Sequence, residues 1–298
     1  MADLSWFQHF PSLDEETLRA IRLAIDGSFR GFTREHGEMM ERLFYPLRDF
    51  LLASEHLLTQ SPWPLVMAGI AAVSWLASRS WRIVLVAMLA LFWVGMFGMW
   101  QDLMKTLSMI FVATVVAIVV GVPIGIWMSY SNRVQKVISP ALDVMQTLPS
   151  FVYLIPVLML LGIGRVPGLI AVVIYAIPPV IRFTNLGIRM VSSELLEAAD
   201  AYGSARWQKM IQVQLPLALP TIMAGVNQTI MLALSMVVVA SMIGVQGLGQ
   251  PVLRAITNQY FAMGLFNGLA IVVIAILFDR LSQAYGQRLQ KHREMSHG

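Results

Sequence analysis

The chain has 298 residues, of which 57% are hydrophobic and only 13% are charged, and its formal net charge is +4. Soluble domains carry about 25% charged residues, so this composition argues against a soluble globular protein and predicts a polytopic membrane protein. The chain contains no cysteine. Disulfides, thiolate metal ligands and cysteine nucleophiles are therefore excluded.

Residues 1–60 form the only long polar region, with ten acidic and six basic residues. Apolar residues recur at helical spacing between residues 13 and 58, which predicts one or two amphipathic helices. We expect Gly27, Gly31 and Gly37 to interrupt them. The region is predicted to be an acidic extracytoplasmic tail that either lies on the membrane surface or helps a partner protein to dock.

Seven apolar segments follow, and a spanning helix needs about 20 residues. Gly121, Pro123 and Gly125 favour a bend in the third segment, and Pro179 predicts that the fifth kinks or ends there. The expected fold is all-α, a polytopic transmembrane helical bundle of about seven spans. The segments cover residues 63–78, 82–100, 104–130, 147–163, 167–185, 217–243 and 262–283.

These segments suggest four regions in chain order. Residues 1–60 are the tail, 61–100 hold two peripheral transmembrane helices, 101–283 hold a core of five helices, and 284–298 form a basic tail. Twelve Lys and Arg residues lie in the loops at one set of helix ends. The other set has only Lys105, Arg165 and Arg254. The positive-inside rule makes the first set cytoplasmic, with the N-terminus outside and the C-terminus inside.

The longest cytoplasmic loop covers residues 182–216. Ser193 is predicted to cap a short helix whose first turns carry acidic residues, which suits the positive end of a helix dipole. Gly203 can take a positive φ and end that helix, and Ser204 can cap a second helix that runs to Met210. Leu215 precedes a proline and is expected to be extended.

The order of residues in this loop is specific. Glu197-Ala198-Ala199 is followed by Gly203 and then by Leu215-Pro216, which resembles the coupling loop of permease subunits of ATP-binding cassette (ABC) importers. Glu-Ala-Ala alone is common, so the alternative is an ordinary amphipathic loop. The resemblance implies that the loop couples the chain to an ATPase. The implied coupling residues are Glu197, Ala198, Ala199, Asp200, Tyr202, Gly203, Arg206, Leu215 and Pro216.

The resemblance extends over residues 100 to 283 and implies a type I importer core. Residues 145–153, 176–182 and 236–244 are similar to the branch that imports glycine betaine, proline betaine, choline or related quaternary amines. The implied localisation is the bacterial inner (plasma) membrane, with several passes through the lipid bilayer. The implied partners are a second permease copy in a homodimer, two ATP-binding subunits and an extracytoplasmic substrate-binding protein. No nucleic acid is expected.

The chain has no Gly-x-x-x-x-Gly-Lys-Ser/Thr phosphate loop. We therefore expect no ATPase activity, no catalytic residue and no bound cofactor in this chain. ATP and Mg would be bound by the partner ATPase. All five histidines lie in the two tails, so no metal site is expected either.

Several residues are candidates for the translocation pathway. Aromatic rings could attract a quaternary ammonium by cation–π interactions, although ordinary packing is the alternative. Polar side chains within a span could face a cavity or join helices by hydrogen bonds. The candidates are Phe151, Tyr153, Tyr175, Asn227, Gln228 and Ser235. By contrast, Asp279 and Arg280 are expected to form a boundary charge pair, and Asp143 to lie on a solvated face.

Other functions predict other patterns. A secondary transporter or channel would be expected to show buried carboxylates within its spans. Between residues 104 and 181 the only acid is Asp143. A membrane enzyme would be expected to show clustered His, Asp or Glu residues. A permease for another amino acid, such as proline or histidine, also remains open.

Overall fold

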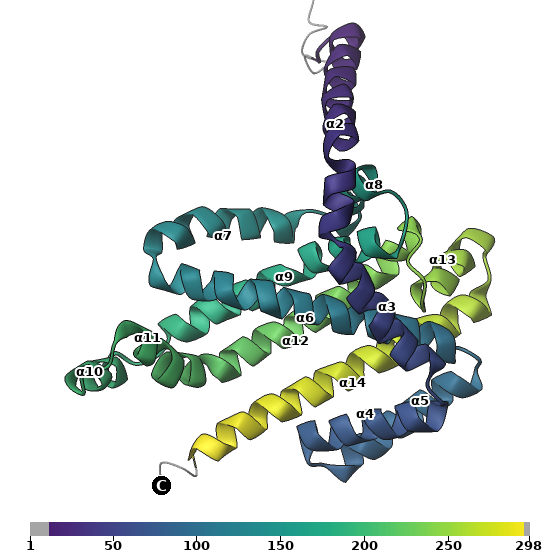
Figure 1. The fold of residues 1–298 in the computed structure, drawn as a ribbon. Coiled ribbons are helices and arrows are strands. Elements are labelled where there is room, and N and C mark those ends of the chain that lie inside the picture. Colours follow the sequence, from purple (N-terminus) through teal and green to yellow (C-terminus); the bar gives the residue numbers. More distant parts are fainter. Residues whose placement is uncertain (1–11, 295–298) are drawn as a thin grey trace, which may run out of the picture.

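The computed structural model describes residues 12–294, and these form helices without any strand. The longest apolar helices are α6 (Trp100–Tyr130), α9 (Arg165–Arg189), α12 (Leu215–Ala240) and α14 (Phe261–Glu294). They lie side by side in one bundle, which Figure 1 shows running across the view. Helix α10 (Ser193–Ala201) lies at one end of this bundle, and α13 (Gly249–Asn258) lies at the other. The prediction of an all-α membrane bundle is confirmed.

The number of spans differs in detail from the seven expected. In the described part of the chain, four helices are long and apolar enough to cross a membrane, or six if each of two bent pairs is one span. All seven predicted segments are helical. Helices α4 (Trp63–Ser78) and α5 (Trp81–Met96) have only 16 residues each, which is less than a span requires.

The fourth predicted segment, residues 147–163, is not one straight helix. Most of it lies within one of the two bent pairs of helices. Helix α7 (Asn132–Thr147) is followed by the short turn η1 (Ser150–Tyr153) and by α8 (Leu154–Leu161). The chain bends by 110° between α7 and α8. The break falls at Leu148-Pro149, where the residue before a proline takes an extended conformation, as its ψ of 133° shows.

The glycines of α6 allow close packing against α9. Helix α6 is one continuous helix, so Gly121, Pro123 and Gly125 do not interrupt it. A Cβ atom at Gly121 would lie 2.5 Å from a methyl carbon of Val180. At Gly125 it would lie 2.6 Å from Cβ of Thr184 and 2.7 Å from the carbonyl oxygen of Ile181. Small residues at such contacts let membrane helices approach closely.

Helix α9 does not end at its prolines, because it continues past Pro178 and Pro179 to Arg189. Both prolines are buried. Helix α12 packs against this segment through Gly225, where a Cβ atom would lie 3.2 Å from the carbonyl oxygen of Pro179. Proline is tolerated within a membrane helix where neighbouring elements stabilise the freed backbone.

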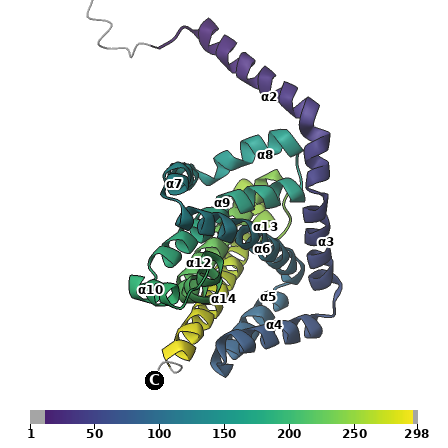
Figure 2. The same cartoon turned by 60° about the vertical axis from the view of Figure 1, so that its left-hand side comes forward.

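The polar N-terminal region forms two helices, α2 (Glu15–Leu43) and α3 (Tyr45–Gln60). The expected breaks at three glycines are wrong, because α2 runs through all of them. The break comes at Phe44, immediately before the Tyr45-Pro46 start of α3. Helix α2 projects away from the bundle, while α3 lies along it (Figures 1 and 2). Helix α3 packs on α6 and contributes Leu51, which is fully buried, to the largest apolar cluster.

Helix α14 also continues beyond the apolar segment that predicted it. It reaches Glu294, so most of the basic C-terminal segment extends this helix. The remaining predicted tail residues, 295–298, and residues 1–11 at the other end lie outside the described part of the chain.

Candidate functional site

The loop between α9 and α12 begins with helix α10. Its N-cap is Ser192, one residue earlier than expected, and the Ser192 hydroxyl accepts a hydrogen bond from the backbone N–H of Leu195 at 3.5 Å. Glu197 and Ala198 are exposed on this helix, whereas Ala199 is buried. Helix α10 therefore turns one small residue toward the protein and leaves the acidic side accessible.

Gly203 ends α10 in the left-handed conformation, with a φ of 76°. Its backbone N–H donates to the carbonyl of Asp200 at 2.9 Å, and the N–H of Ser204 donates to the carbonyl of Ala199 at 3.1 Å. These bonds satisfy carbonyls that the helix end would otherwise leave free. The expected role of Gly203 as a helix terminator matches this geometry, and no atom lies within 4 Å of where its Cβ would be.

The second half of the loop is continuous with α12. Helix α11 (Arg206–Lys209) is followed by the π-helical turn η2 (Met210–Gln214), and α12 begins at Leu215. The prediction that Leu215 is extended is wrong, because its φ and ψ are −60° and −48°. Pro216 comes just after the π-helical turn within this continuous helix, and it has no N–H to donate to the preceding turn. The expected cap at Ser204 is also displaced, since the N-cap is Ala205.

A small apolar cluster fastens this loop to the bundle. Met210 is buried together with Ile188 of α9 and with Ala218 and Ile222 of α12, and Leu215 packs against them. The loop is therefore held by both helices that enter and leave it. A force applied to α10 and α11 would be transmitted to α9 and α12.

The surface of the loop carries aromatic rings. Tyr202 is 92% exposed and Trp207 is 68% exposed. In the same loop, Lys209 donates to both carboxylate oxygens of Asp200, at 2.6 and 2.7 Å, and so joins α11 to α10. Arg206 is exposed beside them. Trp207 was not among the predicted residues, although a tryptophan within a polar loop was a visible signal for a docking surface.

The predicted aromatic candidates do not form a single open surface. Tyr153 is buried, and its ring meets that of Tyr175 edge-on with centroids 5.8 Å apart. The Tyr153 hydroxyl donates to the carbonyl of Met145. Phe151 is 57% exposed, and no ring contact joins it to the tyrosine pair among the described residues.

The predicted polar candidates of α12 separate into two groups. Asn227 donates to Oδ1 of Asp279 on α14 at 3.0 Å, and Ser282 of α14 donates to Oδ1 of Asn227 at 2.5 Å. Asn227 therefore links two helices. Gln228 and Ser235 are both exposed, and their spacing of seven residues places them on one face of α12.

Two other charged residues lie differently from their predicted positions. Asp279 bonds to Asn227 and to Gln283, and no ion pair joins it to Arg280 in the described part of the chain. Asp143 is exposed, as expected of a residue on a solvated face, but it does not lie in a loop. It lies on α7, where Arg182 of α9 donates a hydrogen bond to it.

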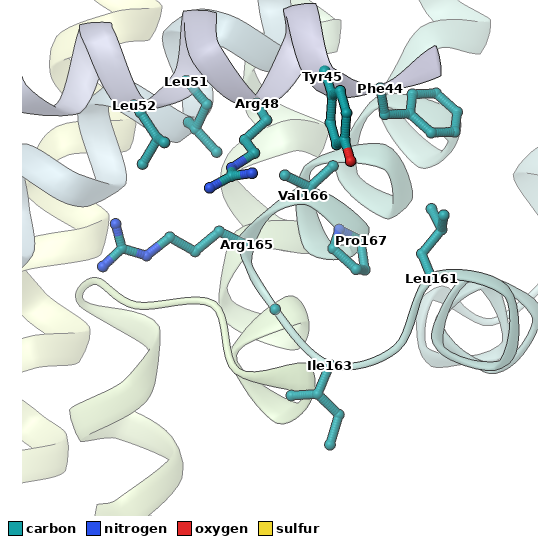
Figure 3. A pocket seen from close by; sticks show the side chains of 11 residues that line it. Phe44, Tyr45, Arg48, Leu51, Leu52, Leu161, Ile163, Arg165, Val166 and Pro167 are labelled. Atoms are coloured by element: carbon teal, nitrogen blue, oxygen red, sulfur yellow. The ribbon is translucent and has the colours of Figure 1, made fainter. Parts of the chain in front are cut away.

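A pocket of about 500 Å³ lies near the α13 end of the bundle, between α3 and the start of α9. Figure 3 shows Tyr45 and Arg48 of α3 lying over Val166 and Pro167 of α9. Arg165 lies at the edge of the pocket. Its guanidinium is engaged elsewhere, because it binds Glu55 and the side-chain oxygen of Gln246.

Comparison with known proteins places this geometry in a family. Residues 117–291 match the family described as "Binding-protein-dependent transport system inner membrane component". The glycine betaine/carnitine transport permease protein GbuB of Listeria monocytogenes is 54% identical over 63% of this chain and 67% of its own length. The glycine betaine/proline betaine transport system permease protein ProW of Escherichia coli is 46% identical over 81% of this chain and 68% of its own length.

A third relative is also named as a glycine betaine permease. The glycine betaine transport system permease protein OpuAB of Bacillus subtilis is 50% identical, over 62% of this chain and 66% of its own length. Among solved structures, an inward-facing conformation of the MetNI methionine ABC transporter matches with a TM-score of 0.57 and 20% identity. The match covers 62% of this chain and 93% of that one, and it concerns the fold alone. The chain is a multi-pass membrane protein that belongs to the family of binding-protein-dependent transport system inner membrane components.

Proposed function

We propose that the chain is the permease subunit of an ATP-driven importer of compatible solutes, namely glycine betaine, proline betaine, choline or a related quaternary amine. The observation that carries this proposal is the loop from α10 to η2. It combines exposed aromatic rings with a rigid attachment to two spans. The names of the relatives GbuB, ProW and OpuAB support the substrate class.

The proposed assembly contains two copies of this chain, two ATP-binding subunits and an extracytoplasmic substrate-binding protein. Glu197, Tyr202 and Arg206 lie on the exposed side of the loop, and they are proposed to enter a groove of the ATPase. ATP and Mg would be bound by that subunit. The proposed orientation places α10 and α11 in the cytoplasm, because the loops at that end carry most of the Lys and Arg residues.

Transport would follow an alternating-access cycle. ATP binding closes the ATPase pair and moves the two coupling loops. Because each loop is packed against α9 and α12, these spans would follow. The binding protein and ATP would then favour the same outward-open state, which is how two separate ligands drive one conformational equilibrium.

A permease for another amino acid, such as proline or histidine, is the alternative. The likeness to the MetNI transporter concerns the fold and does not favour such a substrate. The longer sequence matches are to permeases whose names specify quaternary amines. This favours compatible solutes as the cargo.

Uptake by cells without betaine transporters of their own tests the proposal. The permease is produced with its ATPase and binding protein, and entry of radiolabelled glycine betaine is measured. We expect uptake that requires all three proteins and that excess proline betaine inhibits. Uptake of proline or histidine but not betaine would support the alternative, and uptake without the ATPase would contradict the proposal.

A further inference from the structure

Helix α7 presents three different faces along its length. Val134, Ile138, Leu142 and Met145 pack against an apolar cluster formed with α6, α9 and α12. A second face is apolar but exposed, with Val137 75% accessible. Between them runs a polar stripe that repeats every three or four residues and therefore lies on one side of the helix. The stripe contains Asn132, Lys136, Ser139, Asp143 and Gln146.

The polar stripe meets the arginines of α9 at two points. Arg189 donates to the side-chain oxygen of Asn132 at 2.8 Å and to the carbonyl of Met128, at the end of α6, at 2.9 Å. Further along the two helices, Arg182 forms an ion pair with Asp143. Helices α7 and α9 are thus joined by polar contacts over a large part of the length of α7.

Arg182, where the cytoplasmic loop was expected to begin, lies within α9 instead, and Asp143 of α7 pairs with it. Helix α9 is long and apolar enough to cross the bilayer. Arg182 lies seven residues before Arg189, or about 10 Å inside the helix end at about 1.5 Å per residue. Charged groups within a spanning helix face a protein interior or a water-filled cavity and mark substrate or ion pathways. The side chains are 36% and 62% exposed, so they face an open side of this chain.

The hydrogen-bonding capacity of the pair is only partly used. Arg182 has five N–H donors, and one amino group binds Asp143. The Nε of Arg182 is buried and has no partner among the described residues. Asp143 accepts a single hydrogen bond within the same part of the chain. Arg182 and Asp143 therefore each have hydrogen-bonding capacity that this single contact does not use.

We propose that Asp143 and Arg182 form a substrate-binding step in the translocation pathway, where a zwitterionic quaternary amine separates the pair and takes up both charges. The substrate carboxylate would bind the planar fork of Arg182, which suits two parallel hydrogen bonds. The quaternary ammonium has no N–H to donate, so it would be attracted by the charge of Asp143. Neither protein charge is left unpaired when the substrate enters, and the pair re-forms when the substrate leaves. This inference rests on the proposed function.

Transport by the complete complex in proteoliposomes tests the role of each charge. Arg182→Gln and Asp143→Asn should each lower glycine betaine uptake about tenfold, the rate equivalent of one hydrogen bond to a charged group. Binding-protein-stimulated ATP hydrolysis should persist. The matched control is Arg133→Gln, which removes an exposed charge from the same helix but off the stripe and should leave uptake unchanged. Uptake near the wild-type level in both test variants would overturn the inference.

A variant with the two charges exchanged distinguishes substrate binding by the pair from a purely structural role in holding α7 and α9 together. In Asp143→Arg/Arg182→Asp, an ion pair between α7 and α9 can form again with opposite orientation. Restored uptake would show that the pair only holds the helices together, and this would overturn the inference. Continued loss of uptake in a complex that still hydrolyses ATP is the expected result. If the wild-type complex transports no betaine at all, the proposed function fails instead.

The absence of cysteine allows a second test that does not depend on transport. Ser139→Cys and Gln146→Cys place single thiols on the stripe, and Val137→Cys places one on the exposed apolar face. In membranes, a methanethiosulfonate reagent that carries a trimethylammonium group should label the first two, and glycine betaine should slow this labelling. Val137 is accessible in this chain, but Val137→Cys should resist the charged reagent, because an apolar outer face of a membrane protein contacts lipid, where a charged group is costly. Equal labelling at all three positions, or no protection by betaine, would contradict a betaine pathway along this stripe.

Discussion

Glu55 on α3 accepts hydrogen bonds from one amino group of Arg165 on α9, at 2.8 and 2.9 Å. The two residues are 110 positions apart in the chain. The other amino group of Arg165 binds the side-chain oxygen of Gln246 at 2.8 Å, and Lys105 of α6 donates to the same oxygen at 2.9 Å. One carboxylate on the N-terminal region thus balances part of the charge of a cluster of two cations on the membrane core.

Glu55→Gln should destabilise the protein, because it leaves Arg165 and Lys105 close together without a counter-charge. Glu55 is almost fully buried. Removing one partner of a buried pair costs about 3–5 kcal/mol, and the partial exposure of Arg165 reduces this to about 2 kcal/mol. Thermal unfolding of the purified protein in detergent should show a lower midpoint. The control is Asp49→Asn, an exposed acid on the same helix; equal midpoints for both variants would refute the role of Glu55.

Two truncations should show that the two N-terminal helices contribute differently to the stability of the protein. Helix α2 has no buried residue in the described part, whereas α3 contributes Leu51 and Glu55 to the packed bundle. A chain that lacks residues 1–43 should insert and remain folded. A chain that lacks residues 1–58 should lose stability, because it removes that buried contact. Size-exclusion profiles in detergent measure the difference, and identical profiles for the two truncations would show that α3 is dispensable.

Gly203→Val should uncouple ATP hydrolysis from transport. The left-handed backbone at Gly203 costs roughly 1–2 kcal/mol for a residue with a Cβ, and a β-branched side chain is among the least suited to it. The matched control is Gly203→Asn, since asparagine tolerates this conformation and the site has room for a side chain. We expect binding-protein-stimulated ATPase activity to fall in the valine variant only. Full stimulation there, in a permease present at normal levels, would count against the coupling role.

Gly125→Ala should disturb the packing of α6 against α9. The added methyl group would meet the carbonyl oxygen of Ile181, which cannot move without the backbone. Overpacking of this kind costs about 1–3 kcal/mol. Gly268→Ala is the control, because no atom lies within 4 Å of its Cβ position in α14. A thermal midpoint that falls only in the Gly125 variant is expected, and an unchanged midpoint would show that the helices can separate easily.

The boundaries of helices were the least predictable part of the fold. Gly27 was expected to interrupt a helix and Pro179 to kink or end one, yet neither residue ends its helix. Within a helix, glycine costs about 1 kcal/mol and proline about 3 kcal/mol relative to alanine, and packing against other elements can offset this. Leu148-Pro149 does break its segment. The local sequence alone does not distinguish these cases, because the difference lies in what surrounds each proline.

Side-chain partners could not be predicted for the same reason. Asp279 was expected to pair with its neighbour Arg280, and it binds Asn227 of another helix instead. Asp143 is exposed as expected, but its ion pair with Arg182 of another helix was not predicted. Both partners are distant in sequence, so only the packing of the helices brings them together.

The sequence by itself determined that the chain is an all-α membrane protein with a structured polar loop between two spans, because hydropathy and the spacing of Glu197, Gly203 and Pro216 are local properties of the chain. The tertiary structure alone decided that α3 is joined to the core through Glu55, that glycines on α6 let α9 pack closely against it, and that Asp143 pairs with Arg182. Each of these depends on the distance between helices that the sequence separates widely, and side-chain packing in three dimensions sets that distance.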